Sequence, residues 1–137
     1  MVLEMKVLVC GDRNWKDKEL IRSMIRDKMP DLVITGGARG ADTLAYECCK
    51  EDGFTVTKID ADWNKHGKAA GPIRNRKMLD QTPDLVLAFH DDLSHSKGTL
   101  DTVTEARRRG LQVQLVQHNT SEGGSIDNES PIDRNSK

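Results

Sequence analysis

The sequence predicts an α/β protein: a Rossmann-like three-layer sandwich of about five mainly parallel strands with helices on both faces. Short apolar runs of strand character alternate along the chain with helical patterns of about three turns. Strands separated by such helices favour a parallel sheet that is built from right-handed crossovers. The strand runs are nearly all apolar, as expected for strands that are covered on both faces.

Five short runs are expected to form the strands. The first, MKVLVC, is closed by Gly11, and the second, DLVIT, follows Pro30, which ends the helix before it. The runs TVTKID, DLVLAF and QVQLV continue the alternation toward the end of the chain. The expected strands cover residues 5–10, 31–35, 55–60, 84–89 and 112–116.

Four segments carry apolar residues at helical spacing. Asp17 is placed to cap the first helix, and Gly53 is expected to end the second in a left-handed conformation. Pro72 is expected in the first turn of the third helix, and Gly110 closes the fourth. The expected helices cover residues 18–28, 41–52, 72–79 and 99–109.

The chain is expected to hold one folded domain and a tail. A sequence of 137 residues is most simply one domain, which we assign to residues 1–118. Residues 119–137 contain only two large aliphatic residues among many Ser, Asn, Gly and acidic residues. Such a segment buries too little apolar surface to offset its chain entropy, so it is expected to be a disordered polar tail.

Composition and charge exclude several classes of protein. The formal net charge is −1, so no overall basic field attracts nucleic acid, and recognition of an anion must be local. No apolar run approaches the roughly 20 residues of a membrane span, and no membrane contact is expected. The N-terminus does not resemble a signal peptide, and the three cysteines form no disulfide framework. A cytoplasmic protein with small buried thiols is therefore predicted.

The unusual residues of the chain gather in four loops that follow predicted strands. In a parallel sheet the loops that leave the carboxyl ends of the strands lie along one edge, where ligands bind. The fold prediction therefore brings these loops together at one site. They cover residues 11–15, 36–42, 60–77 and 90–101.

The second loop, GGARGAD, has the character of a phosphate-binding turn. Gly36, Gly37 and Gly40 allow a sharp turn and close approach of a ligand to the backbone, and Arg39 offers a guanidinium fork. The helix expected from Ala41 adds its positive N-terminal end. The spacing matches neither a P-loop nor G-x-G-x-x-G, and a tight turn without a ligand stays an alternative.

The third loop is strongly basic. Between residues 62 and 77 it carries five lysines or arginines against one acid, in a chain whose net charge is close to zero. Gly71 and Pro72, followed by Arg74 and Asn75, place a second helix start with polar side chains near the same ligand. This pattern predicts a local anion-binding patch, and a solvated basic loop is the alternative.

The fourth loop ends in SKGTLD, a second cradle of phosphate-binding type. Gly98 and Thr99 stand at a helix start, with Thr99 expected to cap the helix and to offer its hydroxyl group. Asp101 and Glu105 lie one helical turn apart and are candidate catalytic acids.

The fourth loop also contains metal-binding residue types. His90, Asp91, Asp92 and His95 occur within six positions, but Asp-rich loops are common solvated turns and no zinc spacing is present. We therefore predict no metal site and no cofactor.

The motifs GDRNW, GGARGAD, DADW…GKAAGPIRNRKML, DLVLAF and GTLDTVTEA occur here in order. Together they resemble the YspA-type family, or domain of unknown function 2493, over residues 5–117. That family belongs to the SLOG superfamily of Rossmann-like nucleotide-binding domains, which includes LOG phosphoribohydrolases and DprA single-strand DNA-binding proteins. Many members occur in phages, plasmids and bacterial conflict systems, where nucleotide-derived ligands are their expected targets.

The resemblance implies a ligand-binding set that is drawn from all four loops. Its members are Gly11, Arg13, Gly36, Gly37, Arg39, Gly40, Asp42, Asp62, Trp63, Gly71, Pro72, Arg74, Asn75, Gly98 and Thr99. LOG enzymes carry P-G-G-x-G-T-x-x-E, whose glutamate assists cleavage of the N-glycosidic bond. Thr102 stands at the glutamate position here, so Asp101 or Glu105 would have to take that role.

Three functions are consistent with the sequence. The leading one is binding of a nucleotide or nucleotide-derived small molecule, with N-glycosidic hydrolysis of a nucleoside 5′-monophosphate as the reaction if the ligand is turned over. The second is a non-catalytic sensor or sequestering protein of the phage type. DprA-like binding of single-stranded DNA is third, because the chain has few aromatic residues on which bases could stack. Formation of a homo-oligomer is left open by the sequence.

Overall fold

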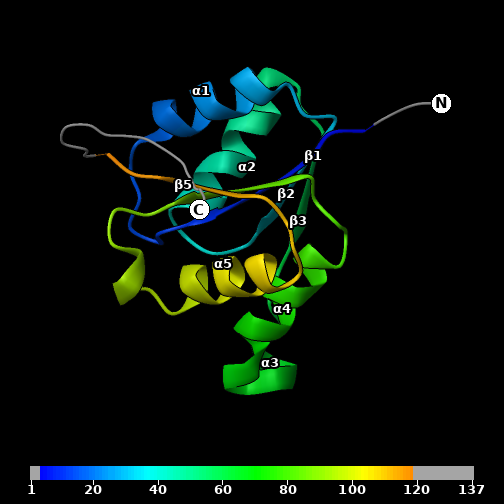
Figure 1. Cartoon of the computed structure of the whole chain (residues 1–137), viewed down its shortest axis with the longest axis vertical. Helices are drawn as coiled ribbons and strands as arrows, with labels where there is room; N and C mark the ends of the chain where they lie inside the picture. The colour runs from blue at the N-terminus through cyan, green and yellow to red at the C-terminus, as the bar shows by residue number, and fades with distance from the viewer. Residues whose placement is uncertain (1–3, 119–137) are drawn as a thin grey trace.

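The computed structural model describes residues 4–118, so the predicted tail at 119–137 lies outside the described residues. One all-parallel sheet runs through this part of the chain, with strand order β3-β2-β1-β4-β5 (Figure 1). The five predicted strands are confirmed, with no boundary shifted by more than one residue. They are β1 (Lys6–Gly11), β2 (Leu32–Gly36), β3 (Val56–Ile59), β4 (Leu85–Phe89) and β5 (Val113–Val116).

Helices cover both faces of the sheet, which confirms the predicted three-layer sandwich (Figure 1). On one face, α1 (Lys18–Lys28) and α2 (Ala41–Asp52) pack through buried residues such as Ile21 against the strands. On the other, α4 (Ala70–Leu79) and α5 (Gly98–Arg108) form a second apolar layer with β1 and β4. Both layers share the central strands, whose side chains alternate between the two faces.

Local signals set the helix ends as expected. Asp17 caps α1 and accepts a 3.1 Å hydrogen bond from the backbone N–H of Leu20. Gly53 ends α2 in the left-handed region with φ of 81°. Cys10, Cys48 and Cys49 are free and buried, which confirms their predicted role as small buried residues.

The third loop contains more structure than the sequence predicts. Helix α3 (Trp63–His66) and a 3-10 turn (Gly67–Ala69) precede α4, and α4 begins two residues before Pro72, which still lies in its first turn. Asp62 explains the start of α3, because its carboxylate accepts a 3.1 Å hydrogen bond from Lys65 N–H. A four-residue helix is too short to show a hydrophobic period, so sequence patterning cannot find it.

The predicted cap of the last helix is wrong. Helix α5 begins at Gly98, so Thr99 lies inside it, and the backbone N–H of Thr99 donates to the hydroxyl of Ser96 over 3.1 Å. Lys97 is the N-cap residue, and the Ser96 hydroxyl accepts from the N–H of Thr99 itself, so Thr99 does not cap the helix. A further 3-10 turn (Leu93–His95) stands before this helix start.

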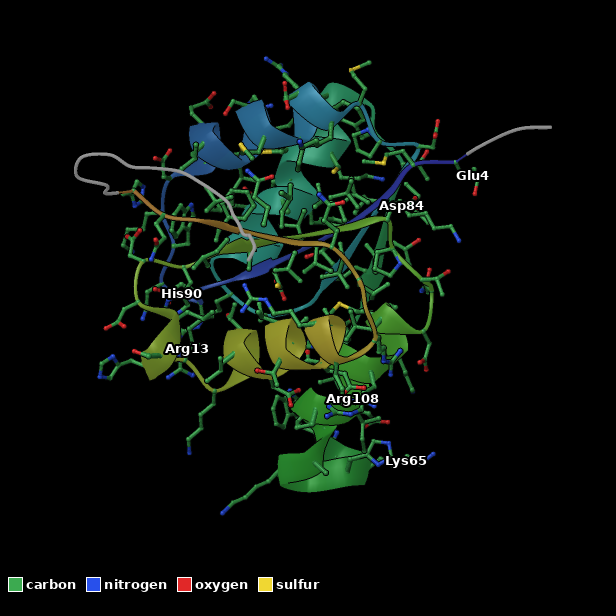
Figure 2. The ribbon with its side chains drawn as sticks, in the orientation of Figure 1. Glu4, Arg13, Lys65, Asp84, His90 and Arg108 are labelled. Carbon is green, nitrogen blue, oxygen red and sulfur yellow. The ribbon has the colours of Figure 1, made fainter. Side chains whose placement is uncertain are left out.

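The topology brings the four loops to one edge. Strand β1 lies between β2 and β4 in the sheet. The connection after β1 leads to β2 on one side, whereas the connection after β4 leads to β5 on the other side. A topological switch point therefore lies at the carboxyl ends of β1 and β4. Figure 2 shows Arg13 and His90 at this edge and Glu4 and Asp84 at the opposite one. Within residues 4–118, no helix is long and apolar enough to cross a membrane.

Candidate functional site

A buried asparagine joins two of the predicted loops. Asn75, which is 4% exposed, accepts a 3.0 Å hydrogen bond through Oδ1 from Nε of Arg74. Its Nδ2 donates to Oδ2 of Asp101 over 3.0 Å and to the carbonyl of Gly98 over 3.4 Å. Four predicted site residues are therefore held in one network between the middle of α4 and the start of α5.

Arg74 extends this network to the glycine turn. A Cβ atom at Gly36 would lie 2.6 Å from Nη1 of Arg74 and 2.7 Å from Oδ2 of Asp42. The guanidinium and the carboxylate therefore both pack directly against the backbone at the end of β2. Only glycine leaves room for them there, which gives the glycine at this position a physical cause.

Asp42 is a buried acid beneath this guanidinium. Its side chain is 5% exposed and sits in the first turn of α2, where it accepts a 3.3 Å hydrogen bond from Ala38 N–H. Burial raises the pKa of Asp42 to about 6, while the charge of Arg74 opposes that rise. A buried carboxylate with a perturbed pKa beside a fixed arginine is typical of a functional site.

Two other predicted glycines have packing roles. A Cβ at Gly11 would collide with the Phe89 carbonyl and lie 2.8 Å from Cβ of Ala41. Gly40 adopts φ of 74° and lies against the carbonyl of Asp12. The absence of side chains at these two positions allows the turn after β1 to pack closely against the turn after β2.

Gly37 differs from its neighbours. A Cβ atom there would overlap the carboxylate of Asp60, which follows β3. The space beside Gly37 is thus filled by an acid, whereas the guanidinium of Arg74 lies on the side of Gly36.

The two candidate catalytic acids have different surroundings. Oδ2 of Asp101 accepts from Asn75 and from Nη1 of Arg76, at 3.0 and 3.1 Å, whereas its Oδ1 has no hydrogen-bond partner within residues 4–118. Glu105 engages both carboxylate oxygens with Arg108 and Arg109. These hydrogen bonds lower the pKa of Glu105 to about 2, the one from Arg108 most strongly. Asp101 therefore keeps an oxygen for a ligand, while Glu105 belongs to an ion-pair cluster further along α5.

Within the described residues, no side chain of the remaining predicted ligand residues hydrogen-bonds to Arg74, Asn75 or Asp101. Arg13 and Arg39 are exposed, and neither side chain has a hydrogen-bond partner in the described part of the chain. Trp63 is 59% exposed and lies over Gly71, where a Cβ would be 3.5 Å from its ring. Within residues 4–118, none of these side chains makes a hydrogen bond or ion pair with Arg74. Thr99 is buried at the start of α5.

Two polar residues at the switch point were not among the predicted ligand residues. Asp12 follows β1, and His90 follows the neighbouring strand β4, with 3.9 Å between Oδ2 of the acid and Nε2 of the imidazole. The sequence suggested His90 only as a metal ligand. Its place directly after an apolar strand was the available signal, since it puts an 8% exposed histidine at the sheet edge.

Other features of the molecule lie away from this centre. Among residues 4–118 no group of three or more His, Cys, Asp or Glu side chains is arranged to hold a metal ion. A cavity of about 400 Å³ is lined by Glu4, Lys6, Thr82 and Asp84. It lies at the amino edge of the sheet, opposite to the predicted ligand residues (Figure 2).

Comparisons with known proteins agree with this architecture. A model of the YspA, cpYpsA-related SLOG family matches residues 5–66. The Gene 61 protein of Mycobacterium phage D29 is 37% identical over 118 residues, with 79% of this chain and 93% of that protein covered.

DNA processing protein A (DprA) from Streptococcus pneumoniae has a similar fold, with a TM-score of 0.69 at 17% sequence identity. The match covers 87% of this chain and 52% of the DprA chain, so this chain spans about half of that protein. At this identity the likeness shows the fold alone. The sequence identity to the phage protein is high enough to show common family membership. Together with the match to the family model, it shows that the chain belongs to the YspA, cpYpsA-related SLOG family.

Proposed function

We propose that this protein binds a nucleotide or nucleotide-derived small molecule at the carboxyl edge of its sheet. The main support for this proposal is the position of the Arg74 guanidinium, which packs on Gly36 and donates a hydrogen bond to Asn75. A guanidinium that is held in one orientation recognises phosphate or carboxylate with geometry as well as charge. Membership of a SLOG family supports a ligand of nucleotide type.

Two helix starts add to the attraction for an anion. Neither α2 nor α5 has a side-chain cap at its N-cap residue, Gly40 or Lys97. A Cβ at Gly98 would meet nothing within 4 Å, so the space before α5 is open. The N–H groups of Ala41 and Thr99 already donate to Asp12 O and Ser96 Oγ, so the attraction for an anionic group at this edge comes from the positive end of each helix and its remaining first-turn N–H groups.

Hydrolysis of an N-glycosidic bond is a second candidate function, and Asp101 is the observation that favours it. Asn75 and Arg76 hold Oδ2, and Oδ1 is left to accept a proton from water or to face positive charge that develops on the sugar. A non-catalytic sensor would use the same binding residues without this step. We assign the catalytic role to Asp101 rather than Glu105, because arginines occupy both oxygens of Glu105.

One experiment tests these functions together. Purified protein is incubated with nucleoside mono-, di- and triphosphates, and both the melting temperature and the released free base are measured. A rise in melting temperature without free base supports a sensor, whereas free base that disappears in Asp101→Asn supports the hydrolase. Arg74→Ala should remove the response, and Arg107→Ala, which deletes an exposed arginine of α5, should retain it. No response to any nucleotide, with salt-sensitive binding of a single-stranded oligonucleotide instead, would favour the DNA-binding alternative.

A further inference from the structure

The imidazole of His90 has an unused hydrogen-bond donor at the switch point. Its Nδ1 accepts a 3.0 Å hydrogen bond from the backbone N–H of Asp92, so the ring proton of the neutral side chain is on Nε2. His90 is 8% exposed, and within residues 4–118 no acceptor lies within hydrogen-bond distance of Nε2. Buried donors are rarely left without a partner, so Nε2–H is a candidate contact for an acceptor atom of a ligand.

Asp12 presents the matching acceptor. Its Oδ1 accepts a 2.8 Å hydrogen bond from Asn14 N–H, and Oδ2 faces His90 Nε2 across 3.9 Å. Backbone hydrogen bonds to Phe89 O and from Ala41 N, of 2.8 and 3.1 Å, hold the residue in place. The Asp12 side chain is 30% exposed, so a ligand can reach it.

A hydroxyl group is the chemistry that satisfies both atoms at once. One oxygen can accept from Nε2–H at about 2.9 Å and donate to Oδ2 at about 2.7 Å, and two such bonds span a gap of this width. A phosphate oxygen would be repelled by the carboxylate, and a cation would leave the Nε2–H group without an acceptor. The pair therefore selects a neutral group that both donates and accepts.

We propose that Asp12 and His90 bind a sugar hydroxyl of the ligand and select ribose over deoxyribose. This inference rests on the proposed function, because the anionic group of the same ligand would lie at Arg74. Gly40 of the glycine turn lies against the Asp12 carbonyl, so the pair borders that turn. The arrangement separates a basic region for the anionic group from an acidic region for the sugar.

Calorimetric titration with nucleoside 5′-monophosphates and their 2′-deoxy and 3′-deoxy counterparts tests the proposal. The wild-type protein should bind at least one deoxy series about tenfold more weakly than the ribonucleotides. Asp12→Asn should weaken ribonucleotide binding to the level of that deoxy series and leave the deoxy affinity unchanged. Asp27→Asn removes the same charge from an exposed side chain on α1 and should keep the preference.

The possible results separate the two proposals. Equal affinity of wild-type protein for all three series, or an unchanged preference in a folded Asp12→Asn protein, would overturn this inference and leave nucleotide binding intact. If Asp12→Asn does not fold, His90→Phe tests the donor with the ring volume kept, and an undiminished ribose preference in it would be equally decisive. Failure of every nucleotide to bind the wild-type protein would overturn both proposals.

Discussion

The side-chain amide of Asn75 donates a 3.0 Å hydrogen bond to Oδ2 of Asp101 and thereby joins α4 to α5 at the edge where the parallel strands end. The two residues are 26 positions apart in the sequence. Because Asn75 also accepts from Arg74, one buried amide fixes both the cation proposed to bind the ligand and the acid proposed to act on it.

Asn75→Ala should therefore damage both stability and binding. The substitution leaves Arg74 Nε and Asp101 Oδ2 each without one partner, and we expect a loss of about 1–3 kcal/mol in the free energy of unfolding. Denaturant unfolding and nucleotide titration measure the two effects. Asn64→Ala, in the exposed part of α3, is the matched control and should change neither. Wild-type nucleotide affinity in a folded Asn75→Ala protein would show that the network does not position Arg74.

Arg74→Lys should weaken nucleotide binding by about 1–3 kcal/mol although the charge is kept, because the guanidinium fork is lost. Lys68→Ala should cost less, and its effect should fade at high salt, since Lys68 is exposed on the 3-10 turn. Titrations at low and high ionic strength distinguish the two. Losses of equal size and equal salt sensitivity would mean that the loop only attracts anions.

Gly36→Ala should remove ligand binding while the protein stays folded. The added methyl group would displace Arg74 Nη1 and Asp42 Oδ2, both of which lie within 3 Å of its position. Circular dichroism reports the fold, and calorimetry reports binding. Undiminished affinity in a folded Gly36→Ala protein would contradict the proposed position of Arg74.

The Glu105 cluster should stabilise the protein in a pH-dependent way. The pKa of Glu105 falls from its ordinary value of 4.5 to about 2 because Arg108 and Arg109 donate hydrogen bonds to it. An acid whose pKa is lowered by folding contributes stability above its unfolded pKa and loses it as pH falls toward the folded one. The melting-temperature advantage of wild type over Glu105→Gln should thus shrink between pH 4.5 and about 2. Asp27→Asn, at an exposed acid, is the control, and an advantage that is constant over this range would contradict the prediction.

His118 should show the opposite dependence. Its Nδ1 and Nε2 lie 2.8 Å from Asp91 and 3.0 Å from Asp17, and its ring stacks on Trp15 with centroids 4.4 Å apart. The hydrogen bond to Asp91 is the main cause that raises the pKa of His118 above 6.5. A group whose pKa is raised by folding contributes fully below its unfolded pKa, and this contribution is lost as pH rises through the folded one.

We therefore compare wild type with His118→Phe, which keeps the stacked ring and removes the charge. The melting-temperature advantage of wild type should be greatest below pH 6.5 and should shrink as pH rises above it. An advantage that grows with pH would show that the neutral imidazole is the stabilising form. His66→Phe, on α3, controls for the loss of a histidine elsewhere.

The sheet and most of its helices could be predicted from the amino-acid pattern alone. Apolar runs of strand length alternate with longer helical periods, and the caps at Asp17 and Gly53 are set by residues within a few positions. These are local signals. The edge at which the loops meet then followed from parallel topology, so the general location of the site could also be predicted.

The contacts between the site residues could be learned only from the folded structure. Asn75 meets Asp101, and Arg74 meets Gly36, across distances in sequence that no local pattern encodes. The short helix α3, the start of α5 and the unused donor of His90 likewise depend on single hydrogen bonds. Hydrophobic periodicity reports which face of a segment is buried; the partner of one polar atom is set by packing between segments, and it becomes visible only when they are folded together.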